Sequence, residues 1–188
     1  LPGSGGRRRD DRPGGRRGAD EQGAVRGREV KAVFATDGTV TAGNSSSIND
    51  GASAVLVTGE GVLDGEPLAR IAGRASHGVD PQDFPIAPIE AANKALARAH
   101  RTWFDVNFVE LNEAFASQSL ACLGEWQDLD AEKVNVFGGA IAIGHPLGAS
   151  GGRILGTLAH GLKARGGKWG VAAICIGVGQ GLAVVIEA

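Results

Sequence analysis

The chain has 188 residues, 43% of them hydrophobic, with 19 Lys or Arg against 21 Asp or Glu, a formal net charge of −2. This length can bury the core of one ordinary domain, and no apolar stretch approaches the roughly 18 residues of a membrane helix. Because the charge is nearly balanced, we expect no nucleic acid and no membrane as partners.

Residues 1–29 differ in composition from the rest of the chain. They hold eight Arg, five Asp or Glu and eight Gly but only four apolar residues, so they cannot bury enough surface to offset the entropy of ordering. We expect a disordered Arg/Gly-rich tail or a translation artefact, and the tail has no aromatic residue to stack on an RNA base. The chain contains no Met, so we expect it to be a fragment.

From residue 30 onward, short apolar runs alternate with helical periods. The pattern predicts an α/β fold, with a mixed β-sheet covered by helices on both faces. In chain order, we expect a strand over 51–57, a half-buried strand over 68–78, a helix over 88–100, a strand leading into a helix over 105–126, a strand and tight turn over 133–144, a helix over 148–167, and two antiparallel strands over 169–177 and 181–188.

Two of these helices have clear boundary signals. Pro88 lies in the first turn of one helix, where its missing N–H costs nothing. Gly166 and Gly167 follow the last periodic residue of the other helix and predict its C-terminal end.

Three polar residues follow apolar runs at expected junctions between elements. Asn112 follows "FVEL", His145 follows "AIAIG", and Cys175 closes "VAAI". Ligands of α/β sheets bind at the ends of strands. Taken singly, each has a commoner structural role: a helix N-cap for the asparagine, and packing for the histidine and the cysteine.

The surrounding glycines favour a functional interpretation. Gly177, Gly179 and Gly181 leave backbone N–H groups uncovered after Cys175, an arrangement that suits a developing oxyanion. The glycines at 148–152 open a helix whose N-terminus adds partial positive charge near His145. The sequence therefore predicts a site that stabilises negative charge on oxygen beside a base and a thiol.

Four motifs in order resemble those of the thiolase family. They are "DGTVTAGNSSSINDGASAVLV" (37–57), which looks like the entry to the C-terminal half, "NEAFA" (112–116), "GGAIAIGHPLGASG" (138–151) and "CIGVGQG" (175–181). The resemblance covers residues 30–188 and implies the C-terminal half of a layered α-β-α thiolase. Within the family, the chain is most similar to bacterial acetyl-CoA acyltransferases that act on 3-oxoacyl-CoA, such as 3-oxoadipyl-CoA.

The resemblance also implies a role for each site residue. His145 would take the proton of a nucleophilic cysteine and then donate a hydrogen bond to the thioester oxygen, and Asn112 would fix a water that is the second donor. Cys175 would be the acid/base on the α-carbon of acetyl-CoA. The N–H of Gly177 would hold the acyl-enzyme oxygen.

The family's nucleophilic cysteine lies in its N-terminal half, and no residue of this chain matches it. Cys122 lies mid-helix in "SLACL" and is expected in the core, so we expect the isolated chain to be inactive. Acyl-CoA and CoA would be substrates rather than cofactors, and the full-length enzyme would be a cytoplasmic homo-oligomer. No Cys/His cluster has metal-ligand spacing, and two cysteines suit a reducing compartment.

Two other functions remain open from the sequence. The chain could be a non-catalytic fragment or subunit that acts only by association, because a sheet face would be exposed. It could also be a Cys/His hydrolase with Cys175 as nucleophile and His145 as base.

Overall fold

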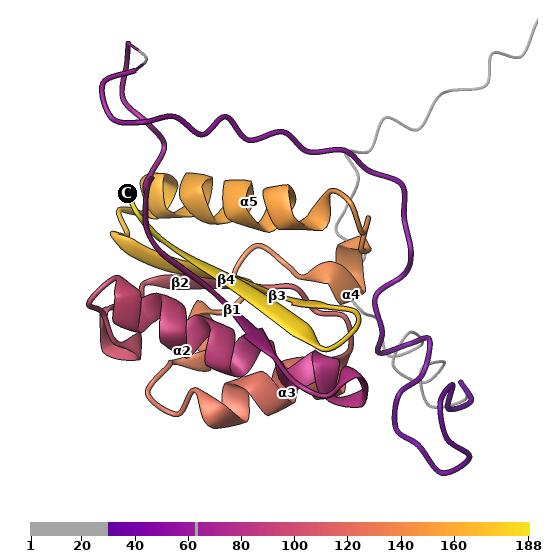
Figure 1. Cartoon of the computed structure of the whole chain (residues 1–188). Helices are drawn as coiled ribbons and strands as arrows, with labels where there is room; N and C mark the ends of the chain where they lie inside the picture. Colours follow the sequence, from indigo (N-terminus) through magenta and orange to yellow (C-terminus); the bar gives the residue numbers. More distant parts are fainter. Residues whose placement is uncertain (1–29, 63) are drawn as a thin grey trace, which may run out of the picture.

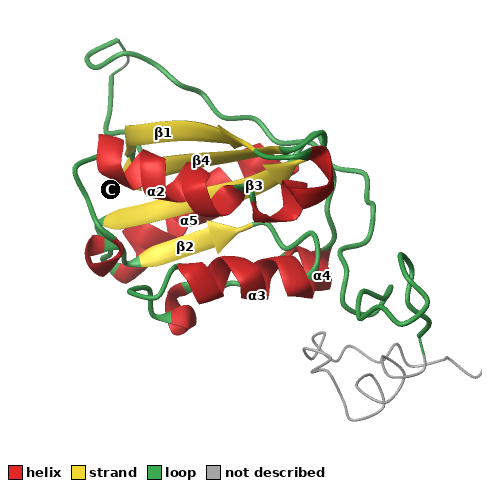
Figure 2. Cartoon of the chain, turned by 60° about the horizontal axis from the view of Figure 1, so that its bottom comes forward, coloured by secondary structure: helices red, strands yellow, loops and turns green. Residues whose placement is uncertain are grey.

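The computed structural model describes residues 30–62 and 64–188, so the expectation for residues 1–29 lies outside the described residues (Figure 1). Four strands form a single sheet in the order β1-β4-β3-β2 (Figure 2). β4 pairs antiparallel with β1 and β3, whereas β2 pairs parallel with β3, so the sheet is mixed as predicted. The strands are β1 (Arg70–Gly78), β2 (Phe108–Leu111), β3 (Trp169–Ile176) and β4 (Gln180–Glu187).

Helices cover both faces of the sheet. α5 lies on one face, and α2 and α3 lie on the other (Figure 1). This layering confirms the predicted α/β fold class. The α-helices are α2 (Pro88–Arg98), α3 (Ala116–Glu125), α4 (Ala140–Ile143) and α5 (Ser150–Arg165), and short 3-10 helices cover Pro81–Ile86, Trp103–Asp105 and Ala131–Lys133. Among the described helices, none has both the length and the apolar character needed to cross a bilayer.

The alternation of side chains along β3 explains the two layers. Val171 and Ala173 pack in the core formed with α2 and α3, whereas Ala172 packs against α5 with Leu158. Successive side chains of a strand point to opposite faces. Because small apolar residues occupy both faces, helices can approach the sheet closely from both sides.

The predicted helix ends are confirmed. Pro88 is the first residue of α2. Gly166, directly after α5, has a φ of 70°, the left-handed conformation that ends helices at low cost for glycine. The predicted pairing of the last two strands is also confirmed, since Cys175 of β3 is opposite Gly181 of β4.

The strand expected over 51–57 is wrong for the chain as described. The segment is extended but pairs with no described strand, and Val55, Leu56 and Val57 are 47%, 79% and 64% exposed. Figure 1 shows it (indigo) running past α4 and over the α5 side of the molecule. An apolar run of this kind forms a strand only where a neighbouring strand supplies backbone partners.

The strand expected within 133–144 is also wrong, whereas the tight turn is present, because Gly138 N donates to Asn135 O at 2.8 Å. Val134 makes only an isolated bridge to Val109, and residues 140–143 form α4. The side chain of Asn135 takes the place of the backbone hydrogen bonds that a neighbouring strand would make with β2. Its Oδ1 accepts from Leu111 N at 2.8 Å, and its Nδ2 donates to Leu111 O at 2.9 Å. Glu113 then accepts a hydrogen bond from Ile141 N at 3.1 Å and supports the first turn of α4.

Candidate active site

Two of the candidate residues are in direct contact. The Asn112 Nδ2 lies 3.4 Å from the His145 Nε2. Asn112 follows β2 directly, and its backbone N–H donates to Ala173 O of β3 at 2.9 Å. His145 lies on the loop between α4 and α5. The fold therefore brings together residues that are 33 positions apart in the chain.

A serine that the sequence did not single out orients the imidazole. The Ser150 Oγ lies 2.6 Å from the His145 Nδ1, and it donates its own hydrogen to Pro146 O at 3.1 Å. Because the hydroxyl hydrogen is used there, the hydroxyl oxygen accepts from Nδ1–H. The Nε2 lone pair then faces the Asn112 amide. The only sequence signal for Ser150 is its position at the start of a helix, where serine is common for other reasons.

The surroundings favour a neutral imidazole. Burial lowers the pKa of His145, and the charge of Arg153 lowers it further. The Arg153 guanidinium lies close because it donates to Gly144 O, next to His145, at 2.9 Å. A neutral ring with a free Nε2 lone pair can accept a proton.

Cys175 and Gly177 lie further along the neighbouring strand. Cys175 is two residues beyond Ala173, which places its backbone roughly 7 Å along β3 from the partner of Asn112. Its side chain is buried, and burial raises the pKa of the thiol. Within residues 30–62 and 64–188, the thiol makes no hydrogen bond to His145 or Asn112.

Gly177 lies in the exposed turn between β3 and β4. For the part of the chain that the structure covers, its N–H donates no hydrogen bond. The next two residues have positive φ, 64° at Val178 and 86° at Gly179. The turn therefore leaves the Gly177 N–H available to an external acceptor.

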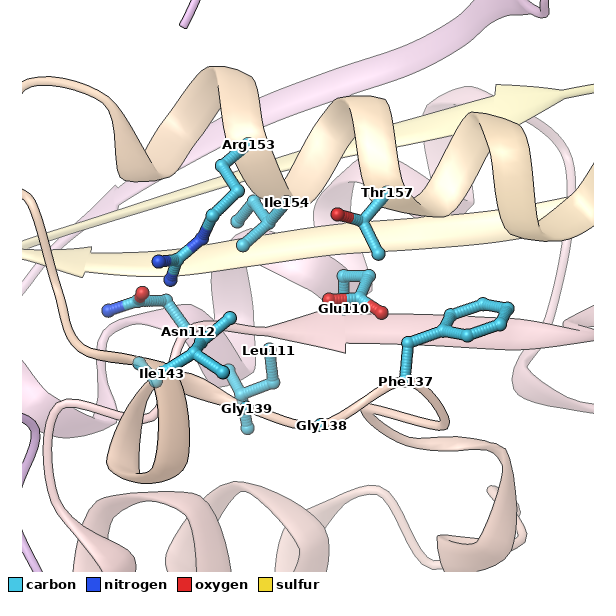
Figure 3. A pocket seen from close by; sticks show the side chains of 11 residues that line it. Glu110, Leu111, Asn112, Phe137, Gly138, Gly139, Ile143, Arg153, Ile154 and Thr157 are labelled. Carbon is cyan, nitrogen blue, oxygen red and sulfur yellow. The ribbon is translucent and has the colours of Figure 1, made fainter. Parts of the chain in front are cut away.

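A cavity of about 160 Å³ lies beside Asn112, between the end of β2, the glycine-rich loop and α5 (Figure 3). Glu110, Asn112, Arg153 and Thr157 supply its polar lining. The Asn112 Oδ1 is buried and accepts no hydrogen bond from any of the residues that the structure describes. The size and the polar lining of the cavity suit ordered water, and such a water can donate a hydrogen bond to the Asn112 Oδ1.

Glu110 is an unexpected titratable group in this cavity. Its side chain is 5% exposed, and burial raises its pKa to about 7, with Arg153 opposing the rise and Glu113 adding to it. Within the sequence, Glu110 is one polar residue in the apolar run "FVEL", and nothing in that run distinguishes a buried carboxyl from an exposed one.

Close packing explains why residue 139 is a glycine. A Cβ on Gly139 would fall within the Glu113 carboxylate. That carboxylate is fixed because it also accepts from Asn135 Nδ2 at 2.7 Å. Glu113, another residue whose role the sequence did not indicate, thus holds the glycine-rich loop against the end of β2.

Cys122 lies in the core, as its mid-helix position led us to expect. It is fully buried, its Sγ lies 3.6 Å from Gln118 Nε2, and burial raises the pKa of its thiol to about 12. Such a thiol is not a nucleophile at neutral pH. Among the described residues, no cluster of His, Cys, Asp and Glu could hold a metal ion.

Comparisons with known proteins identify two family matches. The model described as "Thiolase, C-terminal domain" matches residues 65–188, and the one described as "Thiolase, N-terminal domain" matches residues 26–61. The segment 37–57, expected to open the C-terminal half, thus falls within the N-terminal match.

Two curated relatives show the extent of the similarity. The mitochondrial 3-ketoacyl-CoA thiolase of Homo sapiens is 49% identical over 163 residues, 85% of this chain and 41% of its own length. A probable acetyl-CoA acyltransferase of Staphylococcus aureus (strain MRSA252) is 52% identical over 161 residues, 84% of this chain and 40% of its own. The chain thus spans about two fifths of the length of the curated relatives it matches.

Solved structures agree with this assignment. The acetyl-CoA acetyltransferase of Bacillus anthracis has a TM-score of 0.84 at 43% identity and covers 88% of this chain and 42% of its own. The human mitochondrial 3-ketoacyl-CoA thiolase in complex with CoA has a TM-score of 0.78 at 43% identity, and the match covers 86% of this chain and 41% of the human chain.

Proposed function

The chain belongs to the thiolase family, and on that premise we propose that it is the C-terminal catalytic portion of an acetyl-CoA acyltransferase. It would cleave or form 3-oxoacyl-CoA by acyl transfer to CoA. The observation that carries this proposal is the ordered series Ser150–His145–Asn112, which leaves a neutral imidazole with its Nε2 facing a carboxamide.

The first half of the cleavage reaction uses His145. Its Nε2 accepts the proton of a cysteine thiol outside the 188 residues, and the thiolate attacks the 3-oxo carbon of the substrate. The protonated Nε2 then donates to the thioester oxygen, together with a water held by Asn112. Each such donor contributes roughly 3–4 kcal/mol in related oxyanion sites.

The second half uses Cys175 and Gly177. The bond between C2 and C3 breaks, its electron pair goes to C2, and Cys175 donates its proton there to complete acetyl-CoA. The Gly177 N–H holds the oxygen of the remaining acyl-enzyme. The Cys175 thiolate then accepts the proton of a second CoA thiol, and the CoA sulfur attacks the acyl carbon. The bond to the nucleophilic cysteine breaks, and the departing thiolate takes back its proton from His145. The raised pKa of Cys175 supports this proton-donating role, because the thiol is protonated at neutral pH.

This assignment leaves the isolated chain without a nucleophile. Its only cysteines are Cys122, which is buried in the core, and Cys175, which is the proton donor. We therefore propose that the 188-residue chain alone is inactive. The buried Cys175 thiol and its lack of a described hydrogen bond to His145 also argue against a Cys/His hydrolase.

A grafted enzyme tests the proposal. Residues 30–188 would replace the matching region of the Staphylococcus aureus acyltransferase, and thiolysis of acetoacetyl-CoA by the graft would be compared with that of the isolated chain. We expect turnover only from the graft, a loss of about 10²–10⁴ in kcat for Cys175→Ala, and little change for the control Cys122→Ala. Turnover by the isolated chain, or an active Cys175→Ala graft, would contradict the proposal.

One observation favours the association-only alternative. The backbone of residues 54–57 makes no hydrogen bond with the described chain, and three consecutive apolar side chains there are exposed. A subunit that only associates would form stable complexes through this segment. Light scattering of the chain and of a Val55→Lys/Leu56→Lys/Val57→Lys variant tests it, and a monomeric wild-type chain at high concentration would exclude it.

Oligomeric state and location belong to the whole enzyme. We propose a cytoplasmic homo-oligomer that uses acyl-CoA and CoA, as inferred from the sequence. The bacterial relatives support this location, although the relatives also include mitochondrial proteins. Fractionation of cells that express the full-length enzyme, followed by gel filtration, would check both points.

A further inference from the structure

A short polar segment before β1 contacts the loop after Asn112 and the loop that carries His145. We infer that residues 44–53 ("NSSSINDGAS"), here called the strap, position the Asn112 loop and the His145 loop relative to one another. The inference rests on the proposed function only for the reaction that these loops serve, because the contacts themselves are features of the fold.

The first part of the strap is bonded to the residues that follow Asn112. Ser46 N donates to Ala114 O at 3.0 Å, and Ala116 N donates to Asn44 O at 2.9 Å. These bonds flank Phe115, which forms an isolated antiparallel bridge with the strap residue Ser45. The strap therefore holds the turn between Asn112 and the first residue of α3.

The middle of the strap holds His145 itself. His145 N donates to Ser47 O at 2.8 Å, and Ile48 forms a parallel bridge with His145. Gly144 has a φ of 87°, and a Cβ on it would overlap the side chain of Asn49. The backbone before and at the imidazole is thus fixed by hydrogen bonding and by close packing.

The end of the strap contacts the turn that leads into α5. The Ser53 Oγ donates to Ala149 O at 2.8 Å, directly before Ser150. Gly51 lies against Pro146, and a Cβ on Gly51 would be 2.7 Å from the Pro146 Cβ. The strap thus also fixes the backbone that leads into the serine that orients the imidazole.

These contacts are poorly suited to stabilising the core. Ser47, Ile48 and Asn49 are exposed, and the strap contributes no residue to either hydrophobic cluster. Its bonds go to backbone atoms beside the site residues. The Asn112–His145 contact, at 3.4 Å, is at the long end of the hydrogen-bond range, so a small displacement of either loop breaks it.

The experiment displaces the strap and observes His145 in the 188-residue chain by NMR. Gly51→Ala pushes the strap away from Pro146, whereas the matched control Gly59→Ala adds a Cβ in ordinary contact with Val62 only. Ser53→Ala removes the bond to Ala149, and Ser53→Thr keeps a hydroxyl there. The readouts are the imidazole ¹⁵N shifts at pH 8 and hydrogen exchange of the His145 amide.

In the wild type and in the Gly59→Ala and Ser53→Thr variants, we expect one neutral tautomer with the proton on Nδ1. In Gly51→Ala and Ser53→Ala, we expect a mixture of tautomers and at least about fivefold faster exchange of the His145 amide. The exposed ring of His160 is the internal reference and should not change.

Unchanged ¹⁵N shifts and exchange in both displaced variants would overturn the inference, as would a lower melting temperature without any change at His145. If Gly51→Ala does not fold, the comparison of Ser53→Ala with Ser53→Thr tests the inference. None of these readouts requires turnover, so an inactive graft with a responsive His145 would refute the proposed function alone.

Discussion

Glu110 offers the sharpest test of the site's electrostatics. It lies in the middle of β2, is 5% exposed, and faces the cavity beside Asn112. Burial raises its pKa from 4.5 to about 7, Arg153 opposes the rise, and Glu113 adds to it. Replacing it by glutamine keeps the shape of the protonated acid and removes the titration.

The magnitude follows from the two pKa values. A rise from 4.5 to about 7 corresponds to about 3 kcal/mol between the protonation states. Because the folded-state pKa lies above the unfolded one, the protonated carboxyl stabilises the folded chain fully below pH 4.5. That contribution is lost as the pH rises from 4.5 to about 7.

Urea unfolding at pH 4 and pH 8 measures this loss. Between these two values, we expect the unfolding free energy of the wild type to fall by about 3 kcal/mol relative to that of Glu110→Gln. The exposed Glu125→Gln is the control and should follow the wild type. If Glu110→Gln and the wild type depend on pH in parallel, the carboxyl titrates normally and this account of the cavity is refuted.

Three further predictions concern the histidine, the thiols and the turn. Ser150→Ala removes the acceptor of the His145 Nδ1–H, so the imidazole ¹⁵N shifts should show mixed tautomers that Ser150→Thr restores; a single tautomer in Ser150→Ala would contradict the assignment. Because burial raises both thiol pKa values, iodoacetamide at pH 8 should label Cys175 slowly, at a rate that rises with pH, and should leave Cys122 unmodified. Peptide mass spectrometry measures the labelling of both cysteines, and rapid labelling of Cys122 would be incompatible with its burial. Val178 has a φ of 64°, so Val178→Gly should raise the unfolding free energy by about 1 kcal/mol, and a lower melting temperature would be the opposite result.

Elements with local boundary signals could be predicted from the sequence. Pro88 and Gly166 mark helix ends through their own backbone chemistry, so no tertiary information was needed. The apolar runs of β3 and β4 are separated by a glycine-rich turn, which is sufficient to predict their antiparallel pairing. These signals act within a few residues of the element that they define.

Elements that depend on a distant partner could not be predicted in the same way. Residues 51–57 have the composition of a strand but lack a paired neighbour in the described chain. Asn135 pairs with Leu111 through its side chain, so the run after Lys133 turns away from the sheet. In both cases the local propensity is correct for a strand, and the hydrogen-bond partners decide the outcome.

The same distinction applies to the site. Asn112 and His145 were found because polar residues after apolar runs are conspicuous, and the structure places them in contact. Ser150 and Glu110 were not found, because their roles depend on what faces them. Neither the hydroxyl that orients a ring nor the burial of a carboxyl leaves a pattern in the neighbouring residues.

The charge of one residue, Arg153, affects the pKa of both titratable groups beside Asn112. The charge of Arg153 lowers the pKa of both His145 and Glu110. Its guanidinium donates to the Gly144 carbonyl, and among the described residues it forms no ion pair with a carboxylate, so its charge is not neutralised locally. Burial and this charge together hold the imidazole neutral and ready to accept a proton, whereas burial, against the effect of Arg153, keeps the Glu110 carboxyl partly protonated near pH 7. The resting site is thus a base beside an amide, and this is the state that the first proton transfer of the proposed reaction requires.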